Sequence, residues 1–229
     1  MARPHTHIAI DGPAASGKTT VGRMVARRLH FLYLDTGAMY RALTYLALTT
    51  ETHLDNERAL VHLCEDHPIR VKLDIDAPSG YRIYAGGQEL GPELTSSSVT
   101  SGVSTVAAHP LVRERLVLEQ RAIAAEGPVV MAGRDIGTVV LPGAQFKIFL
   151  TASLGERVQR RRSELLAAGV DVETHHLLEE IEERDRLDET RATSPLRPAA
   201  DARRIDSTGM TAQQVTDEIV AMVDAGARA

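Results

Sequence analysis

The sequence predicts an α/β fold built on a five-stranded parallel sheet flanked by helices, and two observations support this prediction. Short apolar runs recur with helical segments between them, which is the pattern of parallel strands joined by crossover helices. The chain has 229 residues, of which 43% are hydrophobic and 25% charged, and this predicts one globular domain with room for an insertion. The expected strands are HIAID at 7–11, LYLD at 32–35, VVMAG at 129–133, KIFLT at 147–151 and RRIDS at 203–207.

Two amphipathic segments are expected to cover the sheet, one near each end of the chain. In both, apolar residues recur at helical spacing and form one stripe that can pack on strands. These residues are Val21, Met24, Val25 and Leu29 in the first segment, and Val215, Ile219, Met222 and Val223 in the second. The arginine-rich stretch ERVQRRRSELLAAG at 156–169 predicts a further helix, and the segment after it predicts another.

Residues 68–97 depart from this alternation of strands and helices, because apolar and polar side chains alternate there. Ile69, Val71, Leu73 and Ile75 alternate before the turn residues at 77–80, and Tyr81 and Ile83 alternate after them. Such a pattern predicts an antiparallel hairpin or small sheet inserted into the α/β core.

Composition excludes several classes of protein. The net charge of −5 argues against a general nucleic-acid binder. No apolar run approaches the roughly 18 residues of a membrane span, and the first residues lack the order of a signal peptide, so we expect a cytoplasmic protein without membrane contact. The single cysteine, Cys64, is interpreted as a small buried hydrophobe rather than a catalytic thiol.

The stretch IAIDGPAASGKTT contains the phosphate-binding pattern G-x-x-x-x-G-K-[ST] between an expected strand and an expected helix. Successive backbone N–H groups of such a loop surround phosphate oxygens, and small residues keep that path clear. We therefore expect a P-loop NTPase that binds ATP, in which Lys18 bridges the β- and γ-phosphates and the Thr19 hydroxyl is a ligand of Mg²⁺. The expected ATP-binding residues are Gly12, Pro13, Ala14, Ala15, Ser16, Gly17, Lys18, Thr19 and Thr20.

A small-molecule kinase needs a second anion site, and two segments that come directly after expected strands offer one. In LDTGAMYR, Thr36 and Tyr40 could donate hydrogen bonds and Arg41 could bind a phosphate with two hydrogen bonds. In AGRDIGTVV, Arg134 and Asp135 would be exposed at the same edge of the sheet. The alternatives are a surface arginine at 41 and a structural ion pair at 134 and 135.

The last helix before the final strand has an apolar stripe that turns charged. Arg184, Asp188 and Arg191 continue the stripe that Leu177 and Ile181 define. Three charges on the inward face predict either a private salt bridge or a polar ligand, and the phosphate chemistry favours the ligand.

Several arginines also crowd the helix after the fourth strand, of which Arg157 and Arg161 share one face. They predict a flap that brings positive charge to a phosphoryl group, although a solvated helix paired with glutamates is the alternative.

Taken together, the segments IDGPAASGKTT, LDTGAMYR, STVAAHPLVRERL, AGRDIGTVV, ERVQRRR and ERDRLDETRATSPLRPAADA resemble the bacterial cytidylate kinases, which are nucleoside monophosphate kinases. The resemblance implies the reaction ATP + CMP (or dCMP) to ADP + CDP (or dCDP). It also implies a single kinase chain over 1–229, with a core at about 1–40, 98–151 and 192–229. A nucleoside-monophosphate-binding region at about 36–97, with the inserted sheet at about 68–97, and a lid at about 152–172 would complete it.

The resemblance also implies the residue roles. The phosphate of CMP would contact Thr36, Arg41 and Arg134; the cytosine would contact Ser104, Arg113, Asp135 and Arg191; the ribose would contact Arg184 and Asp188; and the lid arginines would be Arg157 and Arg161. Thr36 stands where a serine is common in such kinases, but both keep a hydroxyl. We expect a monomer whose partners are ATP and CMP or dCMP, with no nucleic acid. Another P-loop kinase, acting on UMP or on a non-nucleotide acid, and an ATP-binding regulatory module remain the alternatives.

Overall fold

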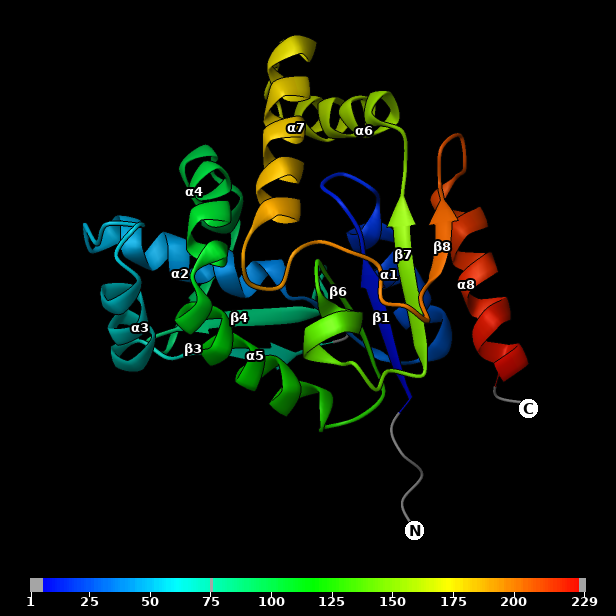
Figure 1. Ribbon diagram of the computed structural model, residues 1–229, viewed down its shortest axis with the longest axis horizontal. Coiled ribbons are helices and arrows are strands. Elements are labelled where there is room, and N and C mark those ends of the chain that lie inside the picture. Colours follow the sequence, from blue (N-terminus) through cyan, green and yellow to red (C-terminus); the bar gives the residue numbers. More distant parts are fainter. Residues whose placement is uncertain (1–5, 75, 227–229) are drawn as a thin grey trace.

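The computed structural model describes residues 6–74 and 76–226, so the outer ends of the expected core segments lie partly outside it. Its centre is a five-stranded parallel sheet in the order β2-β6-β1-β7-β8 (Figure 1). The strands are β1 (His7–Asp11), β2 (Leu32–Asp35), β6 (Val129–Gly133), β7 (Phe146–Thr151) and β8 (Arg203–Asp206). All five strands predicted from the apolar runs are confirmed, and their parallel direction brings their carboxyl ends to one edge.

Helices cover both faces of this sheet. On one face, α1 (Lys18–Leu29) and α8 (Ala212–Gly226) pack through the predicted stripes, with Val25 and Ile219 fully buried. On the other face lie α2 (Gly37–Thr49), α3 (Glu57–Asp66), α4 (Ser97–Ala108) and α5 (Pro110–Ala124). A proline opens α5, where its missing N–H leaves no hydrogen bond unmade.

The inserted sheet is confirmed and has three antiparallel strands, β3 (Ile69–Leu73), β4 (Tyr81–Ala85) and β5 (Gln88–Leu90). The turn between β3 and β4 is closed by hydrogen bonds from Ala77 N to Asp74 O (3.1 Å) and from Gly80 N to Ala77 O (2.9 Å). A 3₁₀ turn (Pro92–Thr95) then leads into α4. Ile69, Ile83 and Leu90 are buried against the helices of this half of the molecule, so the small sheet shares their core.

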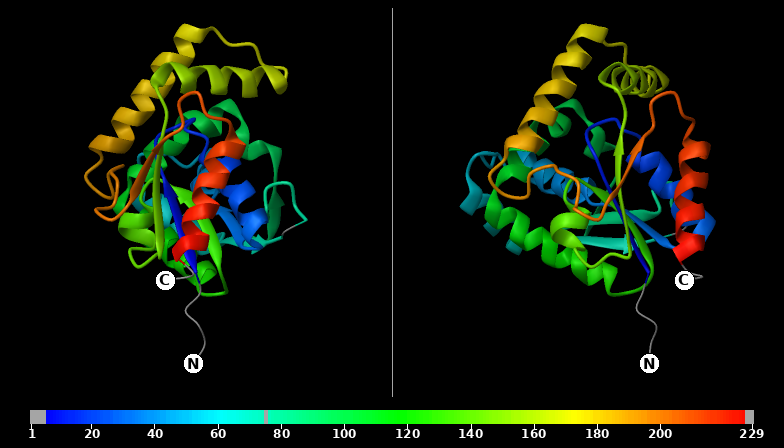
Figure 2. Two further views of the ribbon diagram at one scale, coloured as in Figure 1. Left: turned by 90° about the vertical axis from the view of Figure 1, so that its right-hand side faces the viewer. Right: turned by 45° about the vertical axis from the view of Figure 1, so that its right-hand side comes forward.

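Two helices, α6 (Leu154–Ala167) and α7 (Thr174–Thr190), stand over the carboxyl ends of the strands, at the top of Figure 1. Figure 2 shows from two sides that they meet above the sheet rather than packing on either face of it. Ser153 begins α6 by accepting a hydrogen bond from the Glu156 N–H (3.3 Å). Val158, Leu177 and Ile181 form a small core of their own between the two helices.

No helix among residues 6–74 and 76–226 combines the length and the apolar character that a membrane crossing requires.

Cys64 lies on α3 with 3% of its surface exposed, and burial is the main cause that raises the pKa of its thiol to about 11. Only about one native molecule in a thousand would hold the reactive thiolate at pH 8. We therefore predict that Ellman's reagent leaves the native protein unmodified and labels one thiol per chain once a denaturant unfolds it. Rapid labelling of the native protein would contradict the buried position.

Candidate functional site

The glycine-rich loop links the central strand β1 to α1, and its backbone tolerates no side chain where it passes closest to β7. A Cβ on Gly12 would lie 2.0 Å from the carbonyl oxygen of Leu150. Gly17 begins α1 with a φ of 92°, which favours glycine. Ala15 also has a positive φ of 55°, a conformation that costs a non-glycine residue on the order of 1 kcal/mol and occurs mainly at functional sites.

Lys18 is buried at the start of α1, and its ammonium group lies within the loop. Nζ donates to the carbonyl oxygen of Pro13 (2.5 Å) and to the hydroxyl of Ser16 (3.3 Å). Burial lowers the pKa of Lys18 well below its ordinary value, and repulsion from Arg134 lowers it further. An anion in the loop would reverse this effect, because it would stabilise the charged form.

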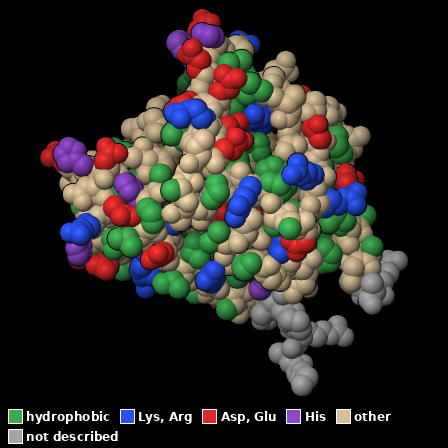
Figure 3. Space-filling view, in the orientation of Figure 1, with side chains coloured by type: hydrophobic (Ala, Val, Ile, Leu, Met, Phe, Trp, Pro, Cys, Tyr) green, Lys and Arg blue, Asp and Glu red, His purple; other side chains and the backbone are tan. Residues whose placement is uncertain are grey.

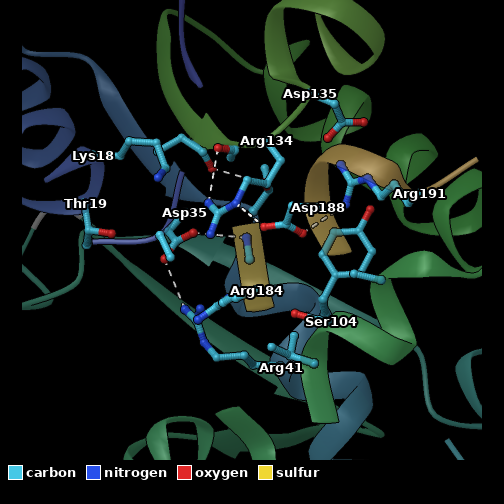
Figure 4. A pocket seen from close by; sticks show the side chains of 18 of the residues that line it. Lys18, Thr19, Asp35, Arg41, Ser104, Arg134, Asp135, Arg184, Asp188 and Arg191 are labelled. Carbon is cyan, nitrogen blue, oxygen red and sulfur yellow. Dashed lines mark hydrogen bonds and ion pairs between the residues drawn. The ribbon is translucent and has the colours of Figure 1, made fainter. Parts of the chain in front are cut away.

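The sheet edge next to the loop holds a pocket of about 190 Å³, here called the inner pocket (Figure 4). Its walls come from β2, β6, α2, α4, α5 and α7 as well as from the loop. Six cations and three carboxylates line it: Lys18, Arg41, Arg113, Arg134, Arg184 and Arg191 against Asp35, Asp135 and Asp188. This excess of positive charge fits a dianionic phosphate group.

Two further pockets flank the loop. The P-loop pocket, of about 430 Å³, contains residues Ala14–Thr20 and shares Lys18, Thr19, Asp35, Arg41 and Arg184 with the inner pocket. The side pocket, of about 420 Å³, lies behind the loop between α6 and the segment after β8, where Ser207 and Met210 form part of its wall. The three pockets together surround the loop, and the P-loop pocket shares lining residues with each of the other two.

The three carboxylates of the inner pocket hold its arginines in place. Asp188 accepts from Arg134 Nε (2.7 Å) and lies 3.6 Å from Arg191 Nη1, an arrangement visible in Figure 4. Asp135 accepts from Arg113 Nη2 (2.5 Å). Arg134 and Asp135 therefore do not pair with each other, although both take part in ion pairs, and both line the pocket.

Asp35 forms the third ion pair. It accepts from Arg41 Nη2 (3.1 Å) and from the backbone N–H of Gly37 (3.0 Å). Burial alone would raise the pKa values of Asp35 and Asp188. For Asp35 the guanidinium of Arg41, with help from Lys18 and Arg134, outweighs burial and lowers the pKa. For Asp188 the pKa is lowered by Arg134, Arg191 and Arg184.

Arg184 differs from the other arginines of the inner pocket, because no ion pair among the described residues includes it. Its Nε is buried without a hydrogen-bond partner. Burial and repulsion from Arg134 lower the pKa of Arg184 to about 10. Buried donors without a partner within the protein are available to a ligand. Other such atoms in the same pocket are Tyr40 Oη, Arg41 Nε, Arg113 Nε and Arg191 Nη2.

The uncharged residues expected at the site also line the inner pocket. The hydroxyl of Thr36 donates to the carbonyl oxygen of Ala132 (3.1 Å), so it has to rotate before it can donate to an anion. Tyr40 lies beneath the guanidinium of Arg113, whose central carbon is 5.3 Å from the ring centre. Ser104 is half-buried on α4.

The arginines of α6 have different surroundings and different partners. Arg161 lines the P-loop pocket as expected, and its only ion pair among the described residues is with Glu164 (3.4 Å). Arg157 instead donates to Asp185 Oδ2 (2.5 Å) and to the carbonyl oxygen of Ala14 (3.1 Å). In this conformation Arg157 therefore supports the loop from behind and lines neither the inner nor the P-loop pocket.

The expectation that Arg191 continues the stripe as part of the helix was wrong. The helix α7 ends at Thr190, and Arg191 has extended backbone angles. The following segment folds back so that the N–H of Leu196 caps the helix by donating to Asp188 O (2.8 Å). Arg191 still reaches the pocket, as do Arg184 and Asp188 from the helix itself.

Two carboxylates at the site were missed by the sequence reasoning. Asp185 accepts from the N–H of Ala14 (3.2 Å), and its spacing of four residues from Ile181 could have placed it on the inward stripe. Asp11, the last residue of β1, is 3% exposed and accepts from two backbone N–H groups of the turn after β6. Its one sequence signal is a charged residue at the end of an apolar run, directly before Gly12.

No group of three or more His, Cys, Asp or Glu side chains suited to a metal ion occurs within the described part of the chain. His175 and His176 are exposed at the start of α7, where Figure 3 shows histidines and acidic side chains together at the tip of the molecule. Oxygen donors in the shared wall of the two pockets, the Thr19 hydroxyl and the Asp35 carboxylate, are the type of ligand that Mg²⁺ takes alongside substrate phosphates.

Comparisons with known proteins found relatives along most of the chain. The family model described as "Cytidylate kinase" matches residues 8–225. The cytidylate kinase of Pelotomaculum thermopropionicum is 50% identical over 222 residues, which cover 97% of this chain and 97% of that protein. The cytidylate kinase of Streptococcus mutans is 51% identical over 203 residues, which cover 89% of each chain.

One solved structure supports the fold alone. A crystal structure of an uncharacterized protein from Eubacterium ventriosum superposes with a TM-score of 0.51 at 11% identity, covering 96% of this chain and 98% of that one.

Asp188 gives a prediction about acid stability. Because the fold lowers its pKa, the ionised carboxylate adds stability above its unfolded pKa, and that stability is lost as the pH falls through the lower folded value. We predict that Asp188→Asn lowers the melting temperature most near pH 7, and that the difference from the parent shrinks towards about pH 3. Asp217→Asn, which removes an exposed pair with Arg28, is the control and is expected to have little effect at any pH. A difference between parent and Asp188→Asn that is independent of pH would contradict the assigned charge.

Proposed function

The chain belongs to the cytidylate kinase family, and we propose that it transfers the γ-phosphoryl group of ATP to CMP and dCMP. The observation that carries this proposal is the shared wall of the two pockets. Lys18, Thr19, Asp35, Arg41 and Arg184 each line both the P-loop pocket and the inner pocket. A donor in one pocket and an acceptor in the other would therefore meet at the same cationic side chains.

The inner pocket would hold the acceptor, with its phosphate near Arg41 and Arg134. Both guanidiniums are already oriented by carboxylates, since Arg41 pairs with Asp35 and Arg134 with Asp188. Oriented arginines can bind a phosphate through two parallel hydrogen bonds with little further loss of side-chain freedom. The Thr36 hydroxyl would add a donor after it rotates away from Ala132.

One end of the inner pocket would bind the base and distinguish cytosine from uracil. Cytosine presents an amino donor where uracil presents a carbonyl acceptor. The carboxylate of Asp135 would accept from that amino group, while Arg113 and Arg191 donate to the ring nitrogen and carbonyl, and Ser104 completes the set. Support comes from the unpartnered donors Arg113 Nε and Arg191 Nη2. Uracil would place its carbonyl against the Asp135 carboxylate.

The ribose would lie between base and phosphate, against Arg184 and Asp188 of α7. Arg184 has a buried donor without a partner, and Asp188 offers carboxylate oxygens to hydroxyl groups. Both side chains come from one helix, so the position of α7 would set the distance between the base and the phosphate.

ATP would occupy the other side of the loop. Its phosphates would lie on the loop backbone in the P-loop pocket, next to Lys18 and within reach of Arg161, and the side pocket is large enough for its base. Transfer between two phosphate groups requires in-line placement and compensation of negative charge rather than a general base. Lys18 and Arg161 would supply that charge at the transferring group, and Arg157 would hold the loop. Closure of the lid, residues 152–172 with the helix α6, would exclude water.

The site suits Mg²⁺, which would be held by the Thr19 hydroxyl, with Asp35 acting through water. When bound, the ion would neutralise charge on the donor phosphates. We further propose that the enzyme is a cytoplasmic monomer that acts on free nucleotides and not on nucleic acid, in line with its net charge of −5.

An acceptor screen tests the proposal directly. With ATP as donor, we predict that CMP and dCMP yield ADP, and that UMP has a kcat/KM lower by about 10² or more, because its base leaves buried charges unpaired. AMP and shikimate complete the screen. Equal use of UMP would contradict the proposed reading of the base. Turnover of shikimate but not CMP would favour a kinase for non-nucleotide acids, and CMP binding without ADP formation would favour a regulatory module.

Lys18 offers a second test. We predict that Lys18→Ala lowers kcat by about 10²-fold or more, because its charge acts mainly on the transferring phosphoryl group. The dissociation constant of CMP, measured by calorimetry without ATP, is expected to stay nearly unchanged. Lys72→Ala is the matched control, since Lys72 is exposed on β3. A comparable loss of CMP affinity in Lys18→Ala would contradict the role.

A further inference from the structure

A buried carboxylate outside both pockets connects the loop to the acceptor side of the site. Asp11 ends the central strand β1, where its Cα is in register with Gly133 of β6 and Phe149 of β7. The next residue is Gly12, which is packed against the backbone of β7 so tightly that a Cβ would lie 2.0 Å from Leu150 O. The position of Asp11 is thus fixed by strands on both sides and by the loop directly after it.

The carboxylate of Asp11 binds the start of a π-helical turn, residues 136–140. Oδ1 accepts from the N–H of Ile136 (2.7 Å), and Oδ2 accepts from the N–H of Gly137 (2.8 Å). The first N–H groups of a helical turn have no partner within the turn, because its own hydrogen bonds begin at Val139 N. Asp11 therefore supplies both partners from a different strand.

This turn comes directly after Arg134 and Asp135, which follow the last residue of β6 and line the inner pocket. The Cα of Gly137 lies close to the side chains of Lys147 and Asp11. A Cβ there would lie 3.2 Å from Lys147 Cδ and 3.3 Å from Asp11 Oδ2. Lys147 directs its ammonium group to Asp201 (2.7 Å), and none of the ion pairs found among the described residues includes Asp11.

We propose that Asp11 is a positioning residue, which fixes residues 134–137 relative to the glycine-rich loop so that Arg134 and Asp135 meet the acceptor in line with the donor. The proposal deepens the proposed function and rests on it. The buried charge of Asp11 supports it, because the two backbone N–H groups offset only part of the cost of burial. Burial is the largest cause that raises the pKa of Asp11 to about 6, and repulsion from Asp135 adds to it, while the two backbone hydrogen bonds and Lys18 act against them. A residue needed only to fill space would not have to be charged.

Asp11→Asn tests the proposal, because an asparagine of the same shape can accept from one of the two N–H groups but turns an N–H towards the other. We predict that the KM for CMP rises about tenfold, while the KM for ATP stays within about twofold. Hydrogen exchange at Ile136 and Gly137 is expected to become faster, which tests the anchor independently of activity. Asp217→Asn on α8 is the control and is expected to match the parent.

Gly137→Ala disturbs the same contact from the other side and keeps the carboxylate, so it serves if Asp11→Asn does not fold. It is expected to raise the KM for CMP by a smaller factor in the same direction. Parent-like KM values in both variants, or equal rises for CMP and ATP, would overturn the inference. If the unmodified enzyme does not phosphorylate CMP, the proposed function is wrong. The anchor is then judged by hydrogen exchange alone, and unchanged exchange in Asp11→Asn would overturn it as well.

Discussion

The site depends on a surplus of positive charge buried at the carboxyl edge of the parallel sheet. Six cations share the inner pocket with three carboxylates, and guanidinium groups cannot relieve their repulsion by losing protons as amines do. The strain is visible at Lys18, whose pKa falls well below its ordinary value, and at Arg184, which has no paired carboxylate among the described residues. The packing of α7 on α4 and α6, together with the ion pair between Arg134 and Asp188, keeps these groups together. A polyanionic ligand would complete the charge balance, so the protein alone is only part of a stable arrangement.

The strand order explains why two anion sites adjoin. The central position of β1 places the glycine-rich loop between the ends of β6 and β7, and β2 lies on the far side of β6. Two of these strands carry pocket residues just beyond their carboxyl ends: Arg134 and Asp135 after β6, and Thr36 and Arg41 after β2. The order of strands therefore brings the two anion sites next to each other, and the helices α4, α5 and α7 supply further residues of the inner pocket.

Sequence reasoning predicted what local patterns encode and missed what tertiary pairing decides. The strands, the inserted sheet and the inward face of α7 could be predicted from periodicity, and Lys18 from a motif. Arg191 was wrongly assigned to the helix. The helix ends before it because the N–H of Leu196 folds back onto the carbonyl oxygen of Asp188, and no local pattern predicts that contact. Asp185 pairs with Arg157, which lies 28 positions away in the sequence. Asp11 accepts a hydrogen bond from Ile136 in the turn after β6, which lies 125 positions away. Contacts of that kind depend on the finished fold, so a single sequence contains no spacing that predicts them.

In this structure two polar groups of the loop have partners within the protein. Lys18 donates to Pro13 O, and the N–H of Ala14 donates to Asp185. A phosphate oxygen that accepts from the N–H of Ala14 would compete with the Asp185 carboxylate, because two anions at one donor repel each other. Asp185 also accepts a hydrogen bond from Arg157, which lies on α6. Occupancy of the loop is thereby linked to α6 and α7 by a single carboxylate, because displacing that group changes the partners of residues on both helices.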